Sequence, residues 1–130
     1  MKSVILILLG FNLVVADDMS IADEREKCEQ KSSSTAEKIV CINKEELVWD
    51  SLMNRDFKRI MNNLSADEKA KFRNVQKTWL AYRDAIFEIS KIIEVKHYGK
   101  EDGSLLNARI KKDIVKYQSE ILMSLAADWE

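Results

Sequence analysis

The sequence predicts an all-α protein, an antiparallel bundle of three long helices with a short N-terminal helix tied to it by one disulfide. The chain has no proline and, beyond its apolar N-terminal segment, only Gly99 and Gly103 as glycines, so helices can run for many residues. Apolar and aromatic residues recur at steps of three and four, which places them on one face of a helix. Short connections between long helices favour antiparallel neighbours, and therefore a bundle.

The first two helices are separated by a polar stretch, "KSSST", at residues 31–35. Residues 19–30 suit a short helix that ends near Cys28. Ser34 and Glu37 have the spacing of a capping box, in which a serine hydroxyl and a glutamate three residues later satisfy each other's backbone N–H groups. The first long helix is therefore expected to begin there and to run to about Asn62.

Two more long helices are expected in the second half. Ser65 and Glu68 form another capping box, and the helix that they open should run to Gly99, which suits a C-terminal cap. The segment "GKEDGS" at 99–104 is expected to be a loop. Ser104 is then placed to cap a last helix that reaches nearly to the end of the chain.

The apolar stripes of the three long helices define the expected core. On the first helix it comprises Ile39, Ile42, Trp49, Met53, Phe57, Ile60 and Leu64, widened by Leu47 and Met61. The second and third stripes are Phe72, Val75, Trp79, Tyr82, Ile86, Ile89 and Ile93, and Leu106, Ile110, Ile114, Tyr117, Ile121 and Leu125. One-sided stripes of this kind bury against partner helices.

The opening segment, "MKSVILILLGFNLVVADD", has the layout of a secretory signal peptide: a lysine, an apolar run and a small residue before two aspartates. Cleavage is expected after Ala16, with Ala22 as the second choice, so residues 1–16 form the signal and 17–130 a single exported domain, periplasmic or secreted. The apolar run is shorter than the roughly 20 residues that span a bilayer, which argues against a stable membrane anchor.

The charge balance argues against a nucleic-acid partner. The signal holds one of the 21 basic residues and none of the 22 acidic ones, so the remaining chain has a net charge of 20 minus 22, or −2. Such a balance offers no broad basic field for nucleic acid or an anionic membrane surface.

Both cysteines, Cys28 and Cys41, lie beyond the signal, where an even number usually means a disulfide. The loop that they close should stabilise the fold by about 3 kcal/mol in the chain-entropy model. Zinc is the competing interpretation. A structural zinc site needs four ligands, and His97 is the one histidine that could join the two thiolates.

A charged pair is predicted beside the core. Arg83 lies about 40° around the helix from Trp79, at the edge of the apolar stripe, while Asp50 falls inside the apolar sector of the first long helix. A carboxylate in that position needs a cation, and the planar guanidinium group of arginine suits it. The sequence therefore predicts an Asp50–Arg83 ion pair that specifies packing, extended by Asn54 and Gln76.

Several segments in fixed order resemble a known family. They are "CEQKSSSTAEKIVC" at 28–41, "DSLMNRDF" at 50–57, "VQKTWLAYRDA" at 75–85, and Gly103-Ser104. Together they are similar to the N-terminal domain of LprI-like lysozyme inhibitors. The resemblance assigns the conserved motif of that family to Asp50, Asn54, Gln76, Trp79, Tyr82 and Arg83. A second cysteine pair that the family commonly carries is missing here, which suits the loss of one bridge in the same fold.

The resemblance implies an exported protein that binds lysozyme and inhibits it without catalysis. An inhibitor needs a surface that fills or covers the acidic cleft of the enzyme. The expected contact segment is the exposed interhelical loop, represented by His97, Tyr98, Lys100, Glu101 and Asp102. The alternative hypothesis is a periplasmic structural, adaptor or immunity-type protein that binds an envelope or secreted protein.

No pattern in the chain supports an enzyme or a cofactor. Catalysis by serine or cysteine with histidine would have to use His97, near the expected end of a helix. Glu94 and His97 have the Glu-x-x-His spacing of di-iron bundles, but those sites need two such motifs, and the chain has one histidine. We therefore expect no catalytic residue, no bound metal and no cofactor.

Overall fold

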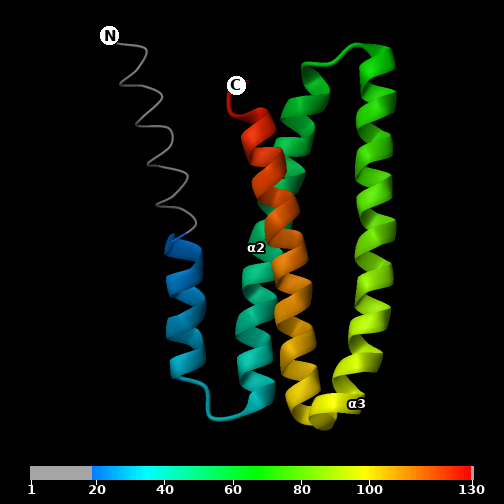
Figure 1. Cartoon of the computed structure of the whole chain (residues 1–130). Helices are drawn as coiled ribbons and strands as arrows, with labels where there is room; N and C mark the ends of the chain where they lie inside the picture. The colour runs from blue at the N-terminus through cyan, green and yellow to red at the C-terminus, as the bar shows by residue number, and fades with distance from the viewer. Residues whose placement is uncertain (1–18, 130) are drawn as a thin grey trace.

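The computed structural model describes residues 19–129, and the signal peptide expected at 1–16 lies outside them. The described chain is all-α, as predicted, with a helix at residues 19–30, here called the N-terminal helix, followed by α2 (Thr35–Asn62) and α3 (Ala66–Ala126). Successive segments alternate in direction (Figure 1). No helix within these residues combines the length and apolarity needed to cross a membrane.

One glycine folds α3 back on itself. Gly99 has φ 80° and ψ 173°, and it is the single non-helical residue inside the 61-residue helix. We call residues 66–98 the first arm and residues 100–126 the second arm. A positive φ costs glycine little because it has no Cβ, so one residue suffices to reverse the chain. The prediction of a loop at residues 99–104 is therefore wrong.

The predicted cap at Ser104 is wrong for the same reason. The second arm already begins at residue 100, so Ser104 lies inside it and its hydroxyl donates to the Lys100 carbonyl at 2.6 Å. The other two predicted caps are confirmed. The hydroxyls of Ser34 and Ser65 accept from the backbone N–H groups of Glu37 and Glu68, and Ser65 completes a full capping box.

The second glycine brings the two arms into contact. A Cβ built on Gly103 would lie 3.0 Å from both the carbonyl carbon and the oxygen of Glu94, and 3.3 Å from the Val95 nitrogen. A real Cβ would therefore have to push the backbone of the first arm away. Gly103 permits the arms to touch one turn after the reversal.

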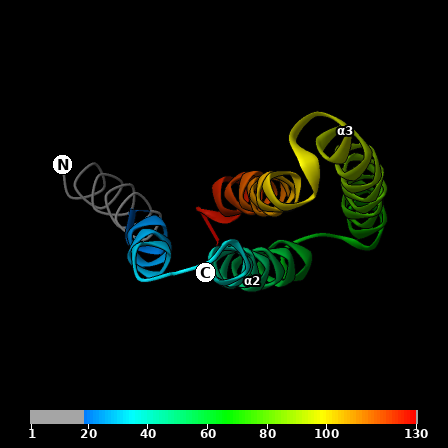
Figure 2. The same ribbon diagram turned by 90° about the horizontal axis from the view of Figure 1, so that it is seen from below.

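Seen along the helices, α2 and the two arms occupy the corners of a triangle, and the N-terminal helix lies beside α2 and the second arm, away from the first (Figure 2). The predicted disulfide is confirmed: Cys28 and Cys41 are bonded, with their Cα atoms 5.7 Å apart. This bond ties the end of the N-terminal helix to the first turns of α2.

A chain of ion pairs holds the N-terminal helix against the other two. Glu29 accepts hydrogen bonds from Arg25 and, at 2.7 Å, from Arg109 of the second arm. Glu45 of α2 contacts Arg25 at 3.2 Å and Lys112 of the second arm at 3.3 Å. Three segments distant in sequence therefore share one charge network.

The buried cluster lies between α2 and both arms of α3. Its members are Trp49, Met53, Ile60, Phe72, Trp79, Val115, Leu122 and Ala126. Phe57 and Phe72 stack across the α2–α3 interface with their ring centroids 5.1 Å apart. The stripe predicted for the first long helix is largely confirmed, whereas Leu47, which was expected to widen it, is exposed.

The stripes predicted for α3 are wrong in part. The exposed members are Val75, Tyr82, Ile89 and Ile93 on the first arm and Tyr117, Ile121 and Leu125 on the second. The second arm buries a different face, on which Val115 and Leu122 lie with the small residues Ala108, Ser119 and Ala126. The stripe with the most large apolar side chains is therefore not the face that is fully buried.

We predict that Gly103→Ala destabilises the protein. Alanine raises helix propensity by about 1 kcal/mol over glycine, so a net loss can come only from the contact with the Glu94 backbone. We expect the free energy of unfolding to fall by about 1–3 kcal/mol, the usual cost of overpacking. Urea denaturation of Gly103→Ala and of the exposed control Glu101→Ala measures this, and equal stability of the two would contradict the close contact.

The charge network makes a pH-dependent prediction. Burial alone would raise the pKa of Glu29, but hydrogen bonds from Arg25 and Arg109 outweigh it and hold this pKa below its ordinary value. Ionised Glu29 therefore stabilises the fold fully above the unfolded pKa, about 4.3, and the contribution is lost as pH falls through the folded pKa.

We expect Glu29→Gln to lower the free energy of unfolding at neutral pH, and we expect this difference from the wild type to shrink as pH falls from the unfolded pKa of Glu29 through its lower folded pKa. Denaturation at several pH values measures the difference, with the exposed Glu24→Gln as control. A difference that is the same at every pH would show that ionisation of Glu29 contributes nothing.

Candidate functional site

Arg83 lies along its own helix. Its Nε and Nη2 donate to Asp84 Oδ1 at 3.0 and 2.9 Å, and its guanidinium carbon lies 5.4 Å from the Trp79 ring and 5.7 Å from the Phe87 ring. The predicted Asp50–Arg83 ion pair is not formed. Two aromatic rings and an adjacent carboxylate satisfy the guanidinium without a partner on α2.

Asp50 has a local partner instead. Asn54, one turn later on α2, donates to Asp50 at 3.4 Å. Burial raises the pKa of the neighbouring Glu46; Lys111 and Arg83 oppose this rise, and the Asp50 carboxylate adds to it. Arg83 of the first arm and Lys111 of the second therefore favour the ionised form of Glu46 of α2 without forming a direct ion pair with it.

Gln76 joins three helical segments. Its side-chain amide donates to the Met53 sulfur of α2 at 3.6 Å and accepts from Gln118 of the second arm at 3.4 Å. Trp79 is buried in the core, but Tyr82 is 58% exposed. The structure thus separates the motif residues: Gln76 and Trp79 contribute to packing, while Tyr82 is available on the surface.

The predicted contact segment lies at the folded-back end of α3. His97, Tyr98, Lys100, Glu101 and Asp102 are all exposed, and the rings of His97 and Tyr98 meet edge to face with centroids 6.5 Å apart. These residues belong to helical turns on either side of Gly99. They form a helical tip in place of the expected loop.

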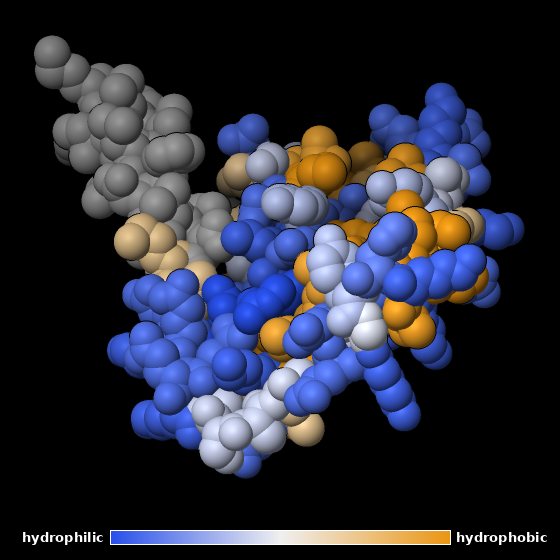
Figure 3. All heavy atoms as spheres, turned by 60° about the horizontal axis from the view of Figure 1, so that its bottom comes forward, coloured by the Kyte–Doolittle hydropathy of each residue, from blue (hydrophilic) through white to orange (hydrophobic). Residues whose placement is uncertain are grey.

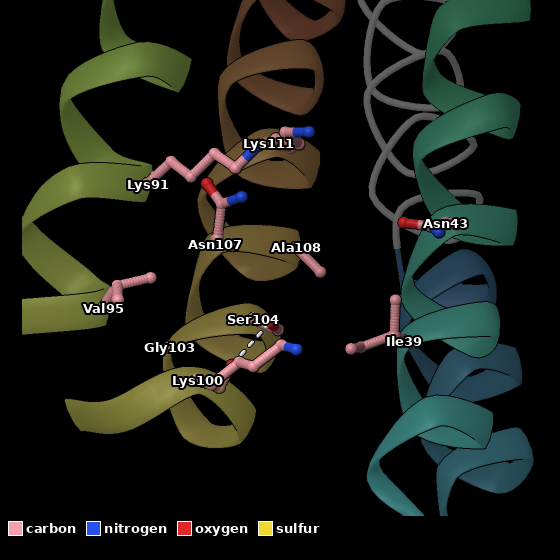
Figure 4. Close-up of a pocket in the computed structure, with 10 residues that line it drawn as sticks. All are labelled: Ile39, Asn43, Lys91, Val95, Lys100, Gly103, Ser104, Asn107, Ala108 and Lys111. Carbon is pink, nitrogen blue, oxygen red and sulfur yellow. Dashed lines mark hydrogen bonds between the residues drawn. The ribbon is translucent and has the colours of Figure 1, made fainter.

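A cavity of about 350 Å³ opens beside this tip, between α2 and the two arms (Figure 4). Its polar lining consists of Asn43 of α2, Lys91 of the first arm, and Lys100, Ser104, Asn107 and Lys111 of the second. Sequence analysis missed Lys91 and Lys111. They are ordinary lysines of polar helix faces, and only the reversal at Gly99 brings them together.

A scan against protein-family models matches the family described as "Lysozyme inhibitor LprI" over residues 26–113. The chain belongs to the LprI family. The matched range includes both cysteines, the motif on α2 and the first arm, and the whole folded-back end of α3. The resemblance to this family is confirmed. A search of curated proteins found no match, and a search of solved structures found none either.

A buried carboxylate of this LprI-family chain, Asp56, also escaped sequence analysis. Asp56 is 1% exposed and accepts from Arg55 Nε at 3.1 Å and Arg55 Nη2 at 3.3 Å, while Arg59 Nη1 lies 3.7 Å away. Arg55 lies one residue before Asp56 and Arg59 three residues after it, and this spacing was the signal in the sequence that could have predicted the contact. Asp56 therefore pairs with arginines of its own helix, whereas the buried Glu45 of α2 pairs with Arg25 of the N-terminal helix.

The lower half of the first arm carries exposed apolar side chains. Ile89, Ile92, Ile93 and Val95 are all exposed, and hydrophobic side chains gather on the side of the molecule where this arm lies (Figure 3). Within residues 19–129, no group of three or more His, Cys, Asp or Glu side chains is arranged to hold a metal ion.

We predict that Asp50→Ala and Arg83→Ala have additive effects on stability, within about 0.5 kcal/mol, because residues without a shared contact do not couple. A double-mutant cycle by urea denaturation measures this. The matched cycle of Arg83 with Asp84 should show a coupling of about 0.2–1 kcal/mol, typical of an exposed pair. Coupling of Asp50 with Arg83 above that range would restore the predicted pair.

Proposed function

We propose that the protein is exported and inhibits a lysozyme by binding its surface, without a catalytic step. The observation that carries this proposal is membership of the LprI lysozyme-inhibitor family over most of the described chain. The disulfide supports export, because such bonds persist in oxidising compartments. In this proposal residues 1–16 direct export and 17–130 form the single mature domain.

The folded-back end of α3 is the surface that we propose to contact the enzyme. Lysozyme cleaves its substrate with two carboxyl groups in a cleft, so an inhibitor gains from cations near the surface that covers it. Lys91, Lys100 and Lys111 lie at this end of the molecule. Tyr98, 58% exposed beside them, offers the kind of aromatic anchor that is enriched at binding hot spots.

The first test is a turbidity assay of cell-wall lysis in which oxidised protein, residues 17–130, is titrated into several lysozymes. We expect saturable inhibition at near-stoichiometric ratios. Loss of a buried aromatic anchor commonly costs about 2 kcal/mol or more, so Tyr98→Ala should weaken inhibition at least about tenfold.

The matched control is Tyr117→Ala, because Tyr117 is similarly exposed, at 61%, on the second arm away from the folded-back end. Equal inhibition by both variants would contradict the proposed surface. No inhibition by wild-type protein that is helical by circular dichroism would reject the lysozyme partner and favour the adaptor or immunity-type alternative.

A further inference from the structure

The cavity beside the tip of α3 has an all-cationic ionisable lining. Lys91, Lys100 and Lys111 line it, and no aspartate or glutamate does. The whole chain carries 21 basic and 22 acidic residues, so a lining with three cations and no anion is a local feature of this place.

These lysines lack carboxylate partners. Among residues 19–129, none of the three forms an ion pair, although ten other ion pairs join residues of the same chain. Lys111 Nζ lies 5.1 Å from the centre of the Phe87 ring, and the carboxylate that it acts on is Glu46, at longer range. Because all three cations line one cavity, each would attract an anion bound in it.

The remaining lining suits a small organic anion. Asn43 and Asn107 supply amide groups, and Asn107 Oδ1 lies 3.1 Å from Ser90 Oγ, whose hydroxyl donates to Glu94 Oε1 at 2.8 Å. Ile39 and Ala108 supply apolar wall. In Figure 4 the Lys91 side chain extends across the opening toward Asn107 and Lys111. A volume of about 350 Å³ is at the lower end of small-molecule sites.

We propose that this cavity binds a small organic group carrying two or more carboxylates or phosphates, held by Lys91, Lys100 and Lys111. The same chemistry has two sources: a free metabolite-sized anion, or acidic side chains of a bound enzyme. The inference does not depend on the proposed function, because binding of a small anion is measured on the protein alone.

The test is a nuclear magnetic resonance titration of ¹⁵N-labelled residues 17–130 with citrate and, separately, pyrophosphate at low ionic strength. We expect saturable shifts confined to amides near residues 39–43 and 91–111, and weaker binding as salt is added, because salt screens the charges. Lys91→Gln and Lys111→Gln should each weaken binding roughly fivefold, the effect of about 1 kcal/mol.

The control is Lys71→Gln, an exposed lysine in the first turns of α3 at the opposite end of the first arm. It should bind like the wild type. Absence of saturable shifts, or equal weakening by Lys71→Gln and Lys91→Gln, would overturn the site. Release of bound citrate on addition of lysozyme would assign the natural anion to the enzyme, and simultaneous binding of both would assign it to a free small molecule.

Discussion

The contact between Gly103 and the backbone of Glu94 is the constraint on which the rest of the structure depends. Gly99 lets α3 reverse at one residue, but the reversal alone does not determine how far apart the arms lie. Gly103 determines that spacing, because a Cβ there would meet the first arm at 3.0 Å. The Ser90–Asn107 and Gln76–Gln118 hydrogen bonds then follow along the arms at increasing distance from the turn.

A second, electrostatic device positions the N-terminal helix. This helix contributes little to the core. Its Ile21 is partly buried and packs against the main cluster. Its place is determined by the disulfide at one end and by Glu29, Arg25 and their partners on α2 and α3. Partly buried ion pairs of this kind require good geometry, and the network provides it by sharing each carboxylate between two cations.

Some features were predictable from the sequence, because each depends on local spacing or on motifs in fixed order. They are the all-α class, the disulfide, two of the three serine caps and the family.

The buried faces of α3 were not predictable in this way. Periodicity selects the stripe with the most apolar residues, but the second arm buries Val115 and Leu122 on a neighbouring face whose other positions are small, such as Ala108 and Ser119. The partner of Arg83 was not predictable either, because its side chain turns to the adjacent Asp84 of its own helix and not to Asp50. The lysine cavity could not be found either, since its members meet only after the reversal.

Together, these features make the folded-back end of α3 the place where the reversal of the helix, an exposed aromatic residue and three lysines meet. Hydrogen exchange of the oxidised protein, alone and with excess lysozyme, tests most directly whether this end is the inhibitory surface. The account predicts new protection concentrated in peptides that span residues 91–111. Protection confined to the N-terminal helix or α2, with residues 91–111 exchanging as in the free protein, would contradict it.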